Sequence, residues 1–288
     1  MPRQQRYLSE VIHTPESSLR HPMQLFRDMG RDLLASRELA WRLMVRDISS
    51  QYRQSFLGIL WAFLPPLITA AGLTLASQAK VLNIAETALP YAAYVMFSMT
   101  LWQTFVEAVN GPIQGVTASK SMLAKINFPR EALVLARLGQ VGFNFAIKLI
   151  LIVGLFLWFK IPVTASVLLA PVALIHLIAL GTAIGLLLTP LAALYDDVTK
   201  GLTLILGAWL FITPVIYPPP TDGLFATLVR LNPVTPLLVT TRELAAEGGV
   251  ISDPQGFWIA SLIAIIGLLL SWLIYRVTMP FVIERMSA

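Results

Sequence analysis

The chain has 288 residues, of which 56% are hydrophobic and only 13% are charged, and its mean hydropathy is +0.72. Soluble domains carry about 25% charged residues, so this composition excludes a mainly soluble protein. The net charge of +5 does not indicate a nucleic-acid-binding protein, because the basic residues flank apolar runs instead of forming a stripe on a soluble face. The chain contains no cysteine, which excludes disulfides, thiolate catalysis and cysteine-ligated metals.

The N-terminal region is basic, with nine arginines and no lysine in residues 1–53. Residues 1–30 combine prolines with scattered charges, and we expect them to form a loosely structured cytoplasmic arm. Residues 31–55 are predicted to form an amphipathic helix. At helical spacing, its basic face holds Arg42, Arg46 and Arg53, and its apolar face holds Trp41, Val45 and Ile48. Such a helix lies in a membrane interface or packs on a partner, and the apolar run that follows favours the interface.

The remainder of the chain, residues 56–279, is predicted to cross a membrane six times. A membrane-spanning helix needs about 20 mainly apolar residues, and six segments reach that length. They are residues 56–77, 89–110, 130–158, 164–191, 198–217 and 256–278. Pro65 and Pro66 provide a point at which the first span can bend. The predicted fold class is therefore an all-α integral membrane protein, with residues 280–288 as a tail.

The distribution of basic residues predicts the orientation. With the N-terminus inside, the inner segments hold 16 lysines and arginines and the outer segments hold four. Because lysine and arginine concentrate on the cytoplasmic side, both termini are predicted to be cytoplasmic.

Two connections differ from simple loops. Between the second and third spans, Gly111, Pro112 and Gly115 are predicted to end a helix, and residues 119–126 are predicted to form a short one. Between the fifth and sixth spans, residues 218–255 contain three consecutive prolines and then the apolar pieces 224–231 and 235–246. These pieces are too short to span a bilayer, and we expect short re-entrant helices in the outer leaflet.

The motifs needed for catalysis by this chain alone are missing from the sequence. There is no GxxxxGK[ST] nucleotide-binding loop, and the three histidines are too far apart to indicate a metal site. Asp196 and Asp197 are adjacent carboxylates, but beside Lys200 they are equally typical of a solvated turn. We therefore predict no catalytic residue, no metal and no cofactor in this chain.

Lys148 and a set of aromatic residues are the candidate transport residues. Lys148 lies in the middle of the third span, so it either lines a hydrated channel or makes a structural hydrogen bond. Aromatic rings stack on the apolar faces of sugars, but they also form ordinary interfacial belts. The predicted channel-lining set is Tyr94, Phe97, Trp102, Lys148, Trp209, Phe211 and Tyr217.

Several motifs occur together in an order that is typical of one family. They are YRQSFLGILWAFLPPL at 52–67, KINFPRE at 125–131, YDDV at 195–198, PVIYP at 214–218 and LNPVTPLLVTTRELA at 231–245. In this order they resemble the export-type ATP-binding-cassette permeases that move lipid-linked polysaccharides. The junction at 52–67 is more similar to O-antigen and teichoic-acid permeases than to capsule permeases. The sequence departs from that pattern at residues 64–66, where LPP replaces a polar residue and a single proline.

The resemblance implies a subunit and not a complete transporter. It implies a homodimer in the bacterial cytoplasmic membrane, with two copies of a separate ATPase subunit that binds ATP and magnesium. The substrate would be a polysaccharide, most simply O-antigen, carried on a polyprenyl anchor among the membrane lipids. Ser119, Lys120, Lys125 and Arg130 would couple to the ATPase, and Arg42, Arg46 and Arg53 would belong to a gate helix.

Two other functions remain open from the residues. One is a permease of the same superfamily that exports small molecules or lipids. The other is a membrane enzyme that transfers sugars from polyprenyl carriers, which would need convergent acidic residues near one face. Co-purification with an ATPase separates a transporter from an enzyme.

Overall fold

The computed structural model describes residues 22–53, 58–81, 85–123, 125 and 128–287. Every regular element of these residues is a helix. The first helices are α1 (Pro22–Ala35), α2 (Arg37–Arg53), the 3-10 helix η2 (Gly58–Ala62), α3 (Leu64–Gln78), α4 (Tyr91–Ala118) and α5 (Lys120–Leu123). The later ones are α6 (Glu131–Phe159), η3 (Ala165–Leu168), α7 (Ala170–Leu194), α8 (Asp196–Ile212), α9 (Gly223–Leu231), α10 (Val234–Ala246) and α11 (Pro254–Ser287).

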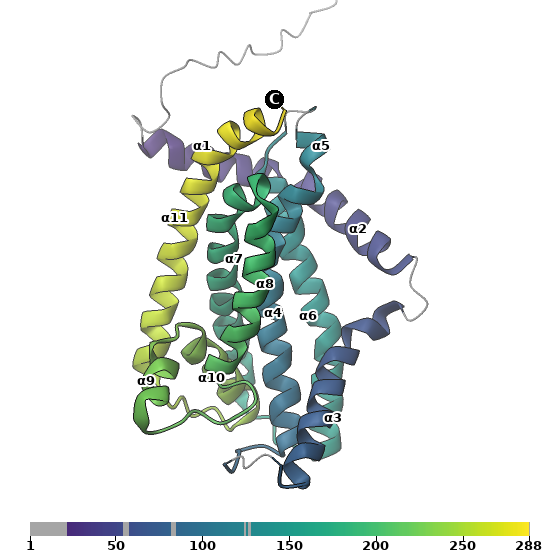
Figure 1. The fold of residues 1–288 in the computed structure, drawn as a ribbon, viewed down its shortest axis with the longest axis vertical. Helices are drawn as coiled ribbons and strands as arrows, with labels where there is room; N and C mark the ends of the chain where they lie inside the picture. Colours follow the sequence, from purple (N-terminus) through teal and green to yellow (C-terminus); the bar gives the residue numbers. More distant parts are fainter. Residues whose placement is uncertain (1–21, 54–57, 82–84, 124, 126–127, 288) are drawn as a thin grey trace, which may run out of the picture.

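The long helices run along the long axis of the molecule. In Figure 1, α4, α6, α7 and α11 run along most of the long axis, the shorter α8 lies beside α7, and α3 lies beside the lower half of α4. Helices α1, α2 and α5 and the C-terminus lie at or near one end, which we call the α5 end. Helices α9 and α10 lie at the opposite end, which we call the α10 end.

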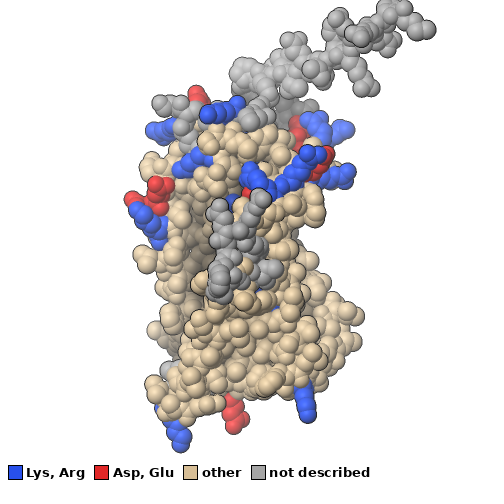
Figure 2. Space-filling view, turned by 90° about the vertical axis from the view of Figure 1, so that its right-hand side faces the viewer, with Lys and Arg blue, Asp and Glu red and all other residues tan. Residues whose placement is uncertain are grey.

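The surface has the pattern of a membrane protein. Figure 2 shows charged side chains gathered at the α5 end, a broad uncharged band, and a few charges at the α10 end. Three helical segments are long and apolar enough to cross a membrane, namely Glu131–Phe159, Ala165–Leu194 and Pro254–Arg285. Helices α9 and α10, bent by 85° at their break, form a fourth only if they count as one span. The chain is therefore a multi-pass membrane protein.

The number of six spans stays a prediction. Helix α3 has 15 residues and α8 has 17, which is below the ~20 that a span requires. The α9–α10 pair fits a re-entrant loop as well as a broken span.

Glycines allow α7 to pack directly on α4 at the centre of the molecule. A Cβ at Gly181 would lie 2.9 Å from the Phe105 carbonyl oxygen, and one at Gly185 would collide with the Val109 carbonyl oxygen. The two glycines are four residues apart on one face of α7, the spacing at which small residues let membrane helices approach closely. Pro112 of α4 lies against Gly185 as well.

The predicted helix end at Gly111, Pro112 and Gly115 was wrong, because α4 continues through these residues to Ala118. The glycines instead make room for a neighbouring side chain. A Cβ at Gly111 would lie 3.3 Å from Cβ of Arg137, and a Cβ at Gly115 would lie 3.2 Å from its Cγ. Helix α4 therefore extends the bundle toward the α5 end.

Two terminal predictions also differ from the structure. The helix predicted over 31–55 is interrupted by a turn at Ser36, and α1 begins earlier, at Pro22. The predicted tail at 280–288 is helical as far as Ser287, because α11 continues through Pro280. Most of the predicted 1–30 arm lies outside the described residues.

Candidate functional site

A polar cleft lies between α2, α4 and α6 and has a volume of about 620 Å³. Most of its lining is polar although the surrounding helices are apolar. The lining residues are Arg46, Asp47, Ser50, Gln51, Val106, Glu107, Asn110, Gly111, Gln114, Ala118, Arg137, Gln140, Val141 and Asn144. Polar side chains gathered between mainly apolar helices of a membrane protein often mark a substrate pathway, so this cleft is the candidate site.

Helical spacing explains why the polar groups face one another. On α4, Glu107, Asn110 and Gln114 follow at intervals of three and four residues, which places them on one face. Arg137, Gln140 and Asn144 repeat the same spacing on α6. Each helix therefore presents a polar stripe to the cleft.

Lys148 lies one helical turn beyond Asn144 on α6 and is paired with a carboxylate of α4. Its Nζ lies 2.5 Å from Oε1 of Glu107, and the lysine side chain is only 3% exposed. Asn144 donates to the other carboxylate oxygen of Glu107 at 3.0 Å. The structure therefore gives Lys148 a structural partner, Glu107, which also lines the cleft.

Asp47 fastens α2 to α6 across the opening of the cleft. Its carboxylate accepts from Arg46 at 2.8 Å and pairs with Arg137 at 3.4 Å. Gln140 donates to Gln51 at 2.8 Å, which adds a second polar contact between the two helices.

A close backbone approach accompanies these polar contacts. Met44 of α2 lies so near Gly139 of α6 that a Cβ there would collide with its sulfur. Helix α2 therefore packs directly on α6 beside the cleft.

The predicted gate arginines have three different environments. Arg46 lines the cleft, as described. Arg42 pairs with Glu38 at 2.7 Å on the exposed side of α2, where both side chains are about three-quarters exposed (75% and 76%). The side chain of Arg53 lies outside the described part of the structure, so its predicted role is untested.

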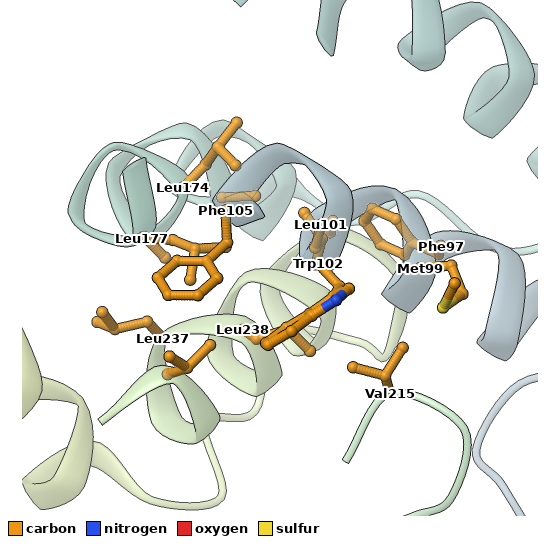
Figure 3. Close-up of a cluster of buried hydrophobic side chains, with 14 of the residues drawn as sticks. Phe97, Met99, Leu101, Trp102, Phe105, Leu174, Leu177, Val215, Leu237 and Leu238 are labelled. Atoms are coloured by element: carbon orange, nitrogen blue, oxygen red, sulfur yellow. The ribbon is translucent and has the colours of Figure 1, made fainter. Parts of the chain in front are cut away.

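Three of the predicted channel aromatics are buried inside the subunit. Tyr94, Phe97 and Trp102 of α4 are 2%, 4% and 4% exposed. Figure 3 shows Trp102 and Phe105 among apolar side chains of α7 and α10. Tyr94 donates to the Tyr217 carbonyl oxygen at 2.8 Å. In this subunit these rings form the core, and whether they meet a polymer stays a prediction.

The other predicted aromatics lie nearer the surface. Trp209 packs edge-on against Phe105 and donates to Asn232 at 3.0 Å. Phe211 is 61% exposed on α8, and Tyr217 donates to its carbonyl oxygen at 2.9 Å. Of the predicted set, Phe211 is the ring that this subunit leaves most open to a partner or substrate.

The predicted coupling residues cluster at the α5 end. Ser119 is a buried C-cap of α4, Lys120 begins α5, Lys125 is exposed and Arg130 is the N-cap of α6. The predicted helix over 119–126 is observed as the four residues Lys120–Leu123, and residues 124 and 126 lie outside the described residues.

Sequence reasoning missed an ion cluster that joins three helices at this end. Arg276 of α11 donates to Asp32 of α1 at 2.6 Å and to Glu131 of α6 at 3.0 Å. Tyr275, the preceding residue, donates to the Arg130 carbonyl oxygen at 3.5 Å. Arginine beside tyrosine near the end of an apolar helix is the only sequence signal, and it does not reveal partners 145 or more residues away.

A second buried cluster, also missed, lies toward the α10 end. Arg242 of α10 is 2% exposed, pairs with Glu247 at 2.6 Å and donates to Ser98 of α4 at 2.9 Å. Its guanidinium carbon also lies 4.1 Å from the ring centroid of Tyr94. This arginine therefore holds α10 against α4.

The described residues contain no group of three histidines or carboxylates arranged to hold a metal ion. The cleft presents amides, one hydroxyl and paired charges, which are groups that form hydrogen bonds with polar molecules. A helical, multi-pass protein with such a cleft has the features of a membrane transport protein.

Comparison with known protein families agrees with that class. The model of the ABC-2 type transporter family matches residues 38–244, so the chain belongs to this family of transporter membrane proteins. The match includes α2, α4 and α6 and therefore the whole cleft.

Two curated relatives show which members of the family the chain is similar to. The chain is 26% identical to the O-antigen export system permease protein RfbA of Myxococcus xanthus over 224 residues, which cover 75% of this chain and 84% of the relative. It is 21% identical to an RfbA protein of the same description from Klebsiella pneumoniae over 211 residues, which cover 70% and 78%.

Proposed function

We propose that this chain is the membrane permease of an ATP-driven exporter that moves lipid-linked polysaccharide, most specifically O-antigen, across the bacterial cytoplasmic membrane. The observation that carries the proposal is the family match over 38–244, supported by relatives that are named O-antigen export permeases. The sequence has no nucleotide-binding loop, so a separate ATPase supplies the energy.

The proposed assembly is two copies of this chain with two ATPase subunits. The ATPase docks at the α5 end, where Ser119, Lys120, Lys125 and Arg130 lie in or next to α5 in the sequence and α5 contacts α11. The concentration of charge at that end supports a cytoplasmic location for it and for both termini.

Deletion and complementation test the substrate. In cells that lack this chain, lipid-linked glycan accumulates inside and O-antigen disappears from the surface, and a plasmid copy restores export. Unchanged surface glycan together with loss of export of a drug or lipid would instead support the small-molecule alternative.

Charge reversal tests the coupling surface. Lys120→Glu with Lys125→Glu is expected to abolish export and to weaken co-purification with the ATPase. The matched control reverses Lys160, which lies at the α10 end of α6. Normal ATPase binding and export by the double variant would exclude this surface as the docking site.

Cysteine labelling tests orientation, because the natural chain has no cysteine. Val250→Cys, after α10, is expected to react with an impermeant maleimide in intact cells. Ser121→Cys, in α5, is expected to react only after permeabilisation. The reverse pattern would invert the proposed topology.

A further inference from the structure

We propose that the polar cleft between α2, α4 and α6 binds a sugar unit of the exported polysaccharide within a single subunit, through its amide and hydroxyl side chains. This proposal rests on the proposed function, because it assumes that the transported molecule carries sugars. It goes beyond that function by locating a substrate contact away from the aromatic residues.

The charges of the cleft do not favour an anion. The lining contains two arginines and two carboxylates, so its formal charges cancel. Arg46 and Arg137 both pair with Asp47. Glu107 is held by Lys148 and Asn144. A phosphate group at these arginines would compete with Asp47 for their guanidinium groups, whereas a neutral ligand leaves the pairs intact.

The uncharged groups match hydroxyl chemistry. Amides donate and accept hydrogen bonds, as sugar hydroxyl groups do, and the cleft contains five of them together with a serine. They are Gln51, Asn110, Gln114, Gln140, Asn144 and Ser50.

Several of these groups keep unused hydrogen-bonding capacity. The side-chain amide of Gln114 makes no hydrogen bond to the part of the chain that the structure describes, although its backbone carbonyl oxygen accepts from Thr117 at 3.4 Å. Asn110 donates to the Val106 carbonyl oxygen, and none of the observed bonds uses its own Oδ1. The Oδ1 atom of Asn144 is buried without a partner. A ligand that donates to the buried Oδ1 of Asn144 would remove the cost of an unpaired buried acceptor, and the side chains of Asn110 and Gln114 offer further donors and acceptors in the same cleft.

The size of the cleft fits a small part of a polymer. Its volume of about 620 Å³ lies within the roughly 300–1,000 Å³ that is usual for small-molecule sites. The lining residues belong to α2, α4 and α6, and α2 bounds one side through Asp47 and Gln51.

Single cysteines on opposite sides of the cleft provide the test. Gln114→Cys and Ser50→Cys each create the sole thiol of the protein, at an exposed position. The variants are reconstituted in vesicles, and maleimide labelling is timed with three preparations. These contain polyprenyl pyrophosphate bearing a neutral disaccharide, polyprenyl pyrophosphate without sugar, or no addition. Val250→Cys, far from the cleft near the α10 end, is the control.

The disaccharide probe is expected to slow labelling of both cleft cysteines about tenfold when it is present at about ten times its Kd. The sugar-free probe and the control position are expected to show no change. Equal protection by both probes would identify a phosphate or lipid site and overturn the proposal. Protection shared with Val250→Cys, or no protection, would overturn it too.

Replacing an amide side chain tests whether protection from labelling depends on hydrogen bonds from the amides. Asn110→Leu in the Ser50→Cys background is expected to remove the protection by the disaccharide probe, and Gln255→Leu at the start of α11 is expected to leave it unchanged. Protection that survives Asn110→Leu would overturn the role of the amides. If cells export glycan normally while the cleft shows no protection, the proposed function stands and this inference fails.

Discussion

Lys148 of α6 and Glu107 of α4 form an ion pair, with Nζ 2.5 Å from Oε1, between helices that are mostly apolar. Lys148→Met removes the cation and leaves the carboxylate without its main partner. A fully buried pair loses about 3–5 kcal/mol on such a change, and the partial exposure of Glu107 reduces the expected loss to about 2 kcal/mol. Thermal unfolding of the purified protein measures it. Lys200→Met, at an exposed pair on α8, is the control and should change stability little.

The α4–α7 contact predicts a strong effect of one methyl group. Gly185→Ala places a Cβ against the Val109 carbonyl oxygen, so the helices must separate. We expect a loss of about 1–3 kcal/mol in the free energy of unfolding, as for other overpacked cores. At Gly207 in α8, an added Cβ would meet open space. Gly207→Ala should therefore leave stability unchanged or raise it slightly. Similar stability of both variants would show that α4 and α7 are not tightly packed there.

The contact between α2 and α6 predicts that cross-linking affects transport. Gln51→Cys with Gln140→Cys, joined by a short bismaleimide, locks the two helices in the observed position. If α2 opens the cleft during each cycle, export stops when the link forms. The single-cysteine variants, treated in the same way, should continue to export. Continued export by fully linked protein would mean that α2 remains on α6 throughout transport.

The Arg276 cluster predicts a graded loss of stability in a series of variants. Arg276→Met leaves Glu131 and Asp32 without their shared partner and is expected to cost about 2 kcal/mol of stability. Arg276→Lys keeps the charge but lacks the planar fork that reaches both carboxylates, so an intermediate loss is expected. Arg285→Met, on an exposed residue of the last turn, is the control. Unfolding temperatures that do not follow this order would contradict the bridging role.

Variants of two aromatic residues distinguish a role in packing from a role in transport. Trp102→Ala empties a buried site and is expected to cost about 3–5 kcal/mol. Phe211→Ala removes a ring that is 61% exposed, so stability should stay close to that of the natural protein. If Phe211 contacts the polymer, its variant exports more slowly while remaining folded. Normal export by folded Phe211→Ala protein would remove this residue from the channel.

The sequence predicted the long helices well because their apolar runs exceed the length of a span. The segment predicted at 130–158 is α6, Glu131–Phe159, and the predicted outer pieces 224–231 and 235–246 are α9 and α10 within a residue. The end of α4 was missed because glycine and proline indicate a helix end only when no neighbour uses the space that they leave. Here the side chain of Arg137 occupies the space beside Gly111 and Gly115.

The candidate site was only partly predictable. Lys148 was identified from its depth in an apolar run, but its partner Glu107 had the pattern of a span boundary. Arg46 was predicted for its position on a basic face. The amides of α4 and α6 recur at intervals of three and four residues, but this spacing does not show which helices face one another. They become a site only when α2, α4 and α6 are brought together.

The glycines of α7 also limit how a transport cycle can proceed. At Gly181 and Gly185 the backbone of α7 contacts α4 without an intervening layer of side chains that could change rotamers. Sliding or rotation of one helix against the other would bring Cβ atoms into carbonyl oxygens within a single turn. We therefore expect α4 and α7 to move as one unit during transport. Any widening that admits a polymer must come from helices on its periphery, such as α2, α3 and α8.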